Sequence, residues 1–342
     1  MEEQNTKPYA DIQIGKEKDA VIEIRGAITP ETLERHKRLV IKDLQKDFES
    51  PGFRKGHVPE AIVEKGIKNS HLLEETANSA LRDVYPLIIE EHGLHVITPP
   101  DVTVTKLAFG NPLEFVLRVG VQPEIKLPDY KKIAKKVMGK ESEETEIKDD
   151  QINEVIEELR RLRTPEGGTA PEITDEFVKS LGAFENVEDF KKKLRENITL
   201  EKELDLRKRK REELGKELTT AAKFPIPSLM IESELIAVRD GLYEEINKNG
   251  VSKGDYFARV GKTEEEFLSA QREAIERQFK MRMLLEAIAK EEHIEPTEDE
   301  LQAEAAVLSA RYRDVDPMTL LRYVTEMLRN EKTLQFLETQ AK

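Results

Sequence analysis

The first third of the chain alternates between strand-like and helix-like patterns of hydrophobic positions. Residues 19–26 alternate in polarity and place Ile22 and Ile24 on one face, which predicts a half-buried strand. The next stretch places its hydrophobic residues on one side of a helix over 29–48, with Thr29 as the N-cap. A strand followed directly by an amphipathic helix indicates a region of mixed α and β structure.

A short helix over 59–67, a longer helix and a hairpin complete this region. Residues 70–93 predict a helix that ends at Gly93, and Pro86 inside it predicts a kink or a break. Residues 101–107 and 113–119 alternate in polarity around a turn, which is typical of a β-hairpin. Helices packed on a small antiparallel sheet make an α+β domain, and we predict that domain here.

The pattern then becomes almost entirely helical. Residues 148–163 predict an amphipathic helix, residues 186–222 a single helix roughly 55 Å long, and residues 227–250 another helix. Further helices are predicted to begin at two capping boxes and at one Asp-Pro pair, which are Thr263 with Glu266, Thr297 with Glu300, and Asp316 with Pro317. Long helices joined by short turns predict an extended, all-α, multi-helix region.

These patterns predict three consecutive segments. An α+β N-terminal domain would occupy residues 1–127. A linker with an amphipathic helix and a Gly-rich joint would occupy 128–170, and an all-α domain of several helices 171–342. Charged residues make up 36% of the chain and aromatic residues only 6%, which favours long solvated helices over a deeply buried enzyme core.

The charge of the chain argues against a broad nucleic-acid surface. It has 55 Lys and Arg residues against 69 Asp and Glu residues, a net charge of −14. Non-specific nucleic-acid binding usually requires an extended basic surface. The basic run over 207–211 is flanked by acidic residues on the same predicted helix, so a solvated, salt-bridged face is favoured over a nucleic-acid patch.

Composition also limits the possible chemistry and the cellular location. The chain has no cysteine, which excludes disulfides, thiolate catalysis and Cys-type zinc sites. Its start is polar and no run approaches the roughly 18 apolar residues of a membrane span, so we expect a cytoplasmic protein that does not engage a membrane. No phosphate-binding loop or catalytic motif is present, and we expect no cofactor. His92 and His95 flank the expected helix end at Gly93, which favours surface histidines over a metal site.

One short stretch, "ESPGFRKGHVPEAIV" over 49–63, stands out between two predicted helices. Its glycines allow positive φ, and its second proline can start the next helix. A phenylalanine on such a turn is available to a partner, and the two cations beside it can pair with phosphate or carboxylate. On spacing alone, an ordinary helix–helix turn with solvated cations is the alternative. The candidate binding residues are Gly52, Phe53, Arg54, Lys55, Gly56 and Pro59.

The whole string resembles the ribosome-binding signature of bacterial trigger factor. In that family the tip carries a Gly-Phe-Arg-Lys run followed by Val-Pro, and Phe53, Arg54 and Lys55 match its core. Residues 123–133, where the chain leaves the N-terminal domain, and the stretch beginning at Pro171 also resemble trigger factor. The resemblance therefore covers most of the chain.

The resemblance implies an ATP-independent chaperone that docks near the nascent-chain exit tunnel of the large ribosomal subunit. The tip would meet acidic side chains of a ribosomal protein or phosphates of rRNA. The helices would hold unfolded or nascent polypeptides, and the family also implies homodimers away from the ribosome. Because flexible thioethers suit varied apolar partners, we take eight residues as candidates for client binding, with a hydrophobic-core role as the alternative. They are Met230, Ile231, Leu235, Met281, Met283, Met318, Leu321 and Met327.

One departure from the family affects the expected activity. The family carries an FKBP-like prolyl isomerase domain after the linker helix, but here only Thr164 to Ala170 separate Arg163 from Pro171. About 25 Å of extended chain cannot hold such a domain. We therefore expect a chaperone that is not an enzyme. A holding chaperone that never visits the ribosome and, less favoured, a prolyl isomerase are the alternatives.

Overall fold

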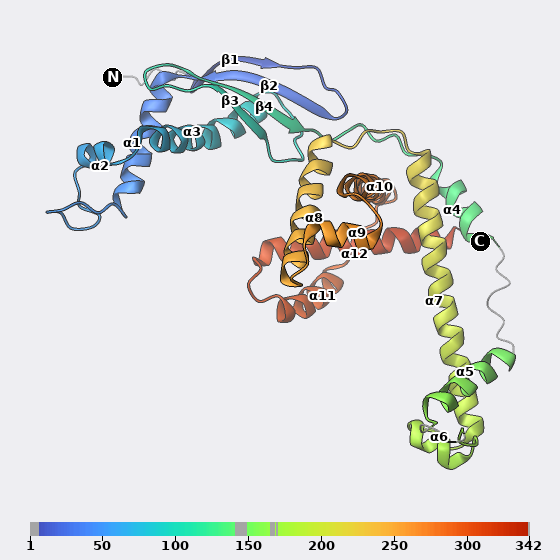
Figure 1. Cartoon of the computed structure of the whole chain (residues 1–342). Coiled ribbons are helices and arrows are strands. Elements are labelled where there is room, and N and C mark those ends of the chain that lie inside the picture. The colour runs from blue at the N-terminus through green and yellow to red at the C-terminus, as the bar shows by residue number, and fades with distance from the viewer. Residues whose placement is uncertain (1–6, 141–148, 165–167, 169, 341–342) are drawn as a thin grey trace. The chain divides into compact units, whose positions relative to one another are not determined.

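The computed structural model describes residues 7–140, 149–164, 168 and 170–340 (Figure 1). The chain forms two compact units, each built from two separate stretches: residues 1–124 with 224–280, and residues 125–223 with 281–342. The division into three consecutive segments stays a prediction. The two units group residues by their packing, so they do not test a division made along the sequence. The fold class is as predicted: a four-stranded antiparallel sheet with helices comes first, and every later element that the structure describes is a helix.

The sheet of the first unit has the strand order β1-β2-β4-β3, with antiparallel neighbours throughout. Its strands are β1 (Tyr9–Ile14), β2 (Val21–Ile28), β3 (Asp101–Lys106) and β4 (Leu113–Gly120). The predicted strand and hairpin correspond to β2 and to β3 with β4, whereas β1 was not predicted. Only Tyr9 of β1 is buried, so this edge strand lacks the apolar alternation that marks the two central strands.

Helices α1 (Pro30–Gln45) and α3 (Asn69–Glu91) pack against each other and on the sheet, and the short α2 (Glu60–Gly66) packs on α1. Their core is mainly aliphatic, and its buried aromatic residues are Phe115 of β4 and Tyr9 of β1. Thr29 caps α1 as predicted, since its hydroxyl accepts a hydrogen bond from the Thr32 N–H at 3.3 Å.

Pro86 was predicted to cause a kink or a break. The chain does not break there, since α3 continues through Pro86 without interruption. Pro86 lies on the exposed side of the helix, where water can reach the carbonyl that loses its intrahelical partner. Val84 and Ile88 on the opposite side are buried and hold both halves of α3 on the core. Gly93 follows the helix with a positive φ of 59°, as expected for its end.

The remaining elements are all helices. They are α4 (Tyr130–Met138), α5 (Asp149–Leu162), α6 (Asp175–Leu181), α7 (Val187–Ala221), α8 (Ser228–Lys248), α9 (Lys253–Val260), α10 (Glu264–Glu291), α11 (Glu298–Arg311) and α12 (Pro317–Thr339). The predicted single long helix is α7. Both predicted capping boxes are confirmed by reciprocal hydrogen bonds, Thr263 with Glu266 and Thr297 with Glu300.

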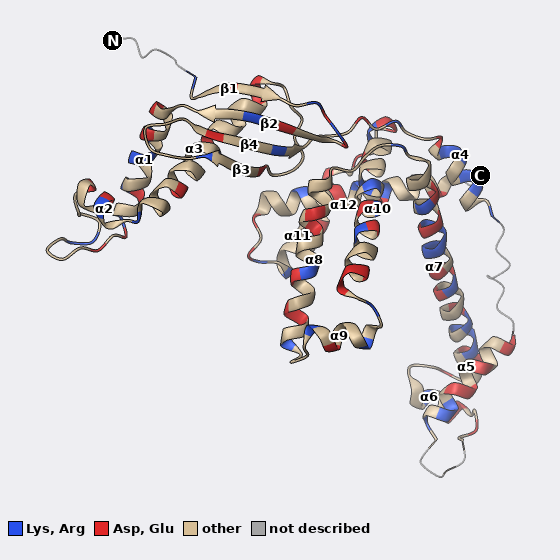
Figure 2. Cartoon of the chain, turned by 45° about the horizontal axis from the view of Figure 1, so that its top comes forward, with Lys and Arg blue, Asp and Glu red and all other residues tan. Residues whose placement is uncertain are grey.

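A small separate core joins α5, α6 and the start of α7. It buries Ile152 and Ile156 of the predicted amphipathic helix against Val178 of α6 and Phe190 of α7. Farther along α7, basic and acidic side chains alternate (Figure 2). The basic run 207–211 is salt-bridged as predicted, but not only within α7: Arg209 pairs with Asp205 of the same helix, whereas Arg207 and Arg211 pair with Glu338 of α12.

Candidate functional site

The loop between α1 and α2 forms a turn-rich tip, residues 46–59, that extends beyond the ends of both helices (Figure 1). Gly52 and Gly56 have φ values of 89° and 80°, a region that strains any residue with a side chain. Each glycine lies in a hydrogen-bonded turn: the Phe53 N–H donates to the Ser50 carbonyl at 3.1 Å, and the His57 N–H to the Arg54 carbonyl at 2.9 Å. Two tight turns therefore fix the backbone on both sides of Phe53 and Arg54.

The tip stands on a small hydrophobic core of its own. Val58 is fully buried there, and its carbonyl accepts a hydrogen bond from the Gln45 side chain at 2.6 Å. Phe48 packs so close to Gly66 that a β-carbon at Gly66 would lie 2.3 Å from the ring. Pro59 was predicted to start the helix, but it is the N-cap of α2, one position before the first helical residue, Glu60. The base of the tip is thus fixed by packing, not only by turns.

The tip displays one aromatic ring and two cations. Phe53 is 44% exposed, so its ring is open to contact with a partner. The Lys55 ammonium lies 3.0 Å from the Asp47 carboxylate, and this hydrogen bond raises the pKa of Lys55. Arg54 is exposed, and its guanidinium makes no hydrogen bond or ion pair with any residue that the structure describes. These groups suit a partner that offers an apolar pocket beside negative charge.

The structure separates the eight candidate client-binding residues by their exposure. Ile231 and Met283 are buried, so they contribute to the packing of α8 and α10. Met318 is 72% exposed and Leu321 is also exposed. The other four are partly buried, and they are Met230, Leu235, Met281 and Met327.

Met318 and Leu321 line a groove of about 540 Å³ between α12 and the second half of α10, which we call the α10–α12 groove. Its other lining residues are Arg282, Glu286, Arg322, Thr325, Glu326, Arg329 and Asn330. The ion pair of Arg282 with Glu326, at 3.5 Å, ties the two helices together. The groove therefore combines exposed apolar side chains with a charged rim.

A second groove of about 540 Å³, the α8–α10 groove, lies in the first unit. It contains the candidate Leu235, next to Ile236 and Leu268, which the sequence analysis did not select. Ile236 is half-exposed and lies one position outside the apolar repeat of α8, which consists of Ile231, Leu235, Val238, Leu242 and Ile246. An apolar residue outside such a repeat is the signal that could have identified it.

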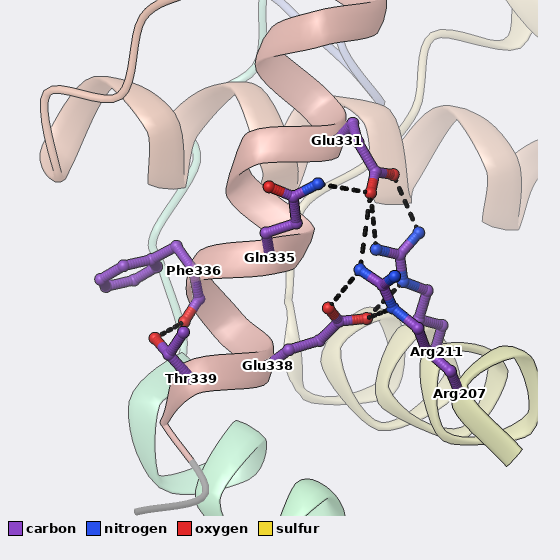
Figure 3. A network of polar contacts seen from close by, with 7 residues as sticks. All are labelled: Arg207, Arg211, Glu331, Gln335, Phe336, Glu338 and Thr339. Carbon is purple, nitrogen blue, oxygen red and sulfur yellow. Dashed lines mark hydrogen bonds and ion pairs between the residues drawn. The ribbon is translucent and has the colours of Figure 1, made fainter. Parts of the chain in front are cut away.

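Helix α12 is held on α7 by a network of four charged side chains (Figure 3). The Arg211 guanidinium donates to Glu338 at 2.5 Å and to both oxygens of Glu331 at 2.7 and 2.8 Å. Arg207 makes a bidentate pair with Glu338 at 2.7 and 2.9 Å. Burial alone would raise the pKa of Glu338, but the hydrogen bonds from both arginines outweigh it and lower that pKa. The network fixes the helix that carries one wall of the α10–α12 groove.

Two family models match this chain. The model "Bacterial trigger factor protein (TF)" matches residues 10–159, which include the tip. The model "Bacterial trigger factor protein (TF) C-terminus" matches residues 186–341. This chain belongs to the trigger factor family.

Individual relatives agree with this assignment. Trigger factor of Clostridium beijerinckii is 26% identical over 394 aligned positions, which cover 86% of this chain and 91% of the relative. Trigger factor of Halalkalibacterium halodurans is 23% identical, with 88% and 90% covered. Because 86% of 342 residues is about 294, about 100 of the 394 positions place residues of the Clostridium protein opposite gaps in this chain.

One solved structure, described as "Promiscuous Substrate Recognition in Folding and Assembly Activities of the Trigger Factor Chaperone", has the same fold. It matches with a TM-score of 0.55 at 18% identity, and the match covers 97% of this chain and 100% of that one. Membership of the trigger factor family supports a ribosome-associated chaperone, the class that the tip motif predicted.

Two features of the described residues bear on other kinds of site. No helix of the described residues is long and apolar enough to cross a membrane. The described residues also contain no group of three or more His, Cys, Asp or Glu side chains that could hold a metal ion. His92 and His95 accordingly have no third ligand of this kind among the described residues.

Proposed function

We propose that this protein is an ATP-independent chaperone that docks through its tip at the exit tunnel of the large ribosomal subunit. It holds unfolded or newly made polypeptides on exposed apolar side chains of its helices and has no prolyl isomerase activity. The observation that carries the proposal is the exposed Phe53, displayed with Arg54 and Lys55 on a glycine-framed loop that has its own hydrophobic base.

The chemistry of the tip favours a partner with negative charge around an apolar pocket. Burial of the Phe53 ring would supply apolar area, and Arg54 would pair with carboxylate or phosphate without first breaking an ion pair within the described residues. Lys55 would exchange its contact with Asp47 for the partner. Acidic side chains of a ribosomal protein fit these requirements, and rRNA phosphate fits the cations alone.

The two grooves suit reversible binding of varied apolar segments. Each joins flexible or aliphatic side chains to charged residues that keep any single contact weak, so that a bound segment is released and can fold. Met318, Leu321 and Leu235 are the predicted client-binding residues that line them. Binding of this kind needs neither a nucleotide nor a covalent step.

The spacing of the matched models supports the absence of isomerase activity. Only residues 160–185 lie between the two models, and they include the short α6, which packs in the small core with α5 and α7. Twenty-six residues are too few for an independent domain of the FKBP-like kind, since even the smallest domains need about 40 residues without metals or disulfides. We propose that the protein acts in the cytoplasm and dimerises away from the ribosome.

Co-sedimentation with ribosomes tests the anchor. We expect the triple variant Phe53→Ala, Arg54→Ala, Lys55→Ala to lose binding. A matched control removes one apolar and two basic exposed side chains of the same unit far along the sequence from the tip, Leu87→Ala, Arg82→Ala and Lys16→Ala, and should bind normally. Equal binding by the two variants would refute the anchor.

Two companion assays test the other parts of the proposal. The tip variant should still suppress the aggregation of an unfolded protein. If the unaltered protein suppresses aggregation but does not sediment with ribosomes, it is a ribosome-independent holding chaperone. Isomerisation of a proline peptide well above background would overturn the absence of isomerase activity. Light scattering over a concentration series that gives a constant monomer mass would remove the dimer.

A further inference from the structure

The first unit contains an open sheet edge that neither the tip nor the grooves use. β3 pairs only with β4 and lies at the end of the strand order (Figure 1). All six of its residues are exposed. An edge strand directs about half of its backbone N–H and C=O groups away from its single neighbour, and these groups can pair with another extended chain.

The edge also exposes two valines, although they lie on the face of the sheet that packs against the hydrophobic core. Val102 is opposite Leu117 and Val104 is opposite Phe115 in the pairing of β3 with β4. Directly paired residues share a face, so both valines lie on the face that buries Leu117 and Phe115 in the core. Yet Val102 is 41% and Val104 38% exposed, because the core cluster ends at β4 and contains no residue of β3.

The open edge continues toward the end of α3. The Ile97 N–H donates to the Gly120 carbonyl at 2.8 Å, and the Gln122 N–H donates to the His95 carbonyl at 2.9 Å, so residues 95–97 extend the edge along the end of β4. Beside them lies a cavity of about 680 Å³ lined by α3 residues such as Tyr85 and Ile89 and by residues 93–99. Unpaired backbone, half-covered valines and an apolar cavity therefore adjoin along one edge.

The charges of β3 favour a neutral occupant. Asp101 pairs with Arg118 at 3.4 Å and Lys106 with Glu114 at 3.3 Å, both across the β3–β4 ladder. The charged ends of the strand are thus already neutralised, and the stretch between them carries only valine and threonine. An added strand would place alternate side chains over Val102 and Val104, so apolar residues at every second position fit best.

We propose that this edge, β3 with residues 95–99, is a second polypeptide-binding site, which accepts an extended, uncharged segment of an unfolded chain by strand addition. Main-chain hydrogen bonds to β3 would supply affinity for any sequence, and the two valines with the cavity would select alternating apolar side chains. The site would lie on the unit that carries the tip. The inference rests on the proposed chaperone function only in its choice of an unfolded chain as the occupant.

The test uses the full chain and a fluorescent synthetic peptide in which valine and threonine alternate between solubilising ends. A control peptide carries proline at alternate positions, which removes N–H donors and prevents strand addition. We expect the alternating peptide to bind and the proline peptide not to bind. We also expect the bound peptide to slow amide hydrogen exchange in residues 101–106.

Matched variants separate the two faces of the strand. Val102→Lys with Val104→Lys should weaken peptide binding about tenfold, because it removes the apolar face and desolvates charge on binding. Thr103→Lys with Thr105→Lys adds the same charge to the same strand and should leave binding unchanged. Circular dichroism checks that both double variants fold, and the exchange protection of the unaltered protein provides a test that needs neither variant.

Four outcomes would overturn the inference. They are equal weakening by both double variants, equal binding of the proline peptide, unchanged exchange over 101–106, and a doubled mass that depends on Val102 and Val104. The last would show that a second copy occupies the edge. Protection confined to α8, α10 and α12 would refute the β3 site and leave the proposed holding function intact, whereas failure to bind any unfolded chain would refute both.

Discussion

Replacement of Arg211 by methionine should loosen α12 from α7. Methionine keeps much of the length and apolar stem of the side chain but removes three charge-assisted hydrogen bonds. The side chains of Arg211 and Glu338 are 24% and 19% exposed, whereas that of Glu331 is 41% exposed. The contact with Glu338 should therefore contribute most of the free energy, and the contacts with Glu331 much less because water screens them.

The expected loss is about 2 kcal/mol. A hydrogen bond to a charged group contributes about 1.5–3 kcal/mol when buried and about 0–1 kcal/mol when solvated. Arg207 stays paired with Glu338, so the variant does not leave that carboxylate without a partner. A loss of about 2 kcal/mol corresponds to local opening that is about 30-fold more frequent.

Amide hydrogen exchange of the full chain measures this opening directly. Residues 331–339 should exchange about 30-fold faster in Arg211→Met. Lys208→Met removes the same charge from an exposed position one turn away on α7 and should leave them unchanged. The pKa values of Glu331 and Glu338 are lowered, so the stability from the network is complete at neutral pH and is lost as the pH falls through those lowered values. Equal exchange rates in the two variants would refute the conclusion that this charged network holds α12 on α7.

Two further predictions concern buried residues. Burial lowers the pKa of His36, Arg35 lowers it further, and Asp83 opposes them. The neutral imidazole is therefore preferred on folding, so its contribution to stability is present above the ordinary value of 6.5 and decreases as the pH falls. An NMR titration of His36 should give a pKa below 6.5, and a higher value would contradict the burial argument. Separately, Ile156→Ala should cost about 2–4 kcal/mol by leaving a cavity. Amides of α5 and α6 should then exchange faster than in a Glu154→Ala control while those of the sheet do not, and unchanged exchange in α5 would show that Ile156 does not hold this core.

The tip could be predicted from the sequence because its structure is local. Gly52 and Gly56 are where positive φ is needed, and the phenylalanine between them has too few neighbours in the loop to be buried. The client-binding candidates were harder, since the same residue type occurs in opposite environments. Met318 is open to solvent and Met283 is buried, although both lie on amphipathic helices. Their exposure depends on which helix packs beside them, and one helix cannot specify that.

Elements with strong local signals could be predicted from the amino-acid sequence alone. These are the central strands, the long α7, the capping boxes and the turn-rich tip, because apolar periodicity, side-chain caps and glycine φ act over a few residues. How these elements pair depends on contacts that form only in the folded chain. The network of Arg211 with Glu331 and Glu338 joins residues 120 and 127 positions apart, and the open edge at β3 exists because the core ends at β4. Such features depend on packing between distant segments, whose free energies are set by the whole fold.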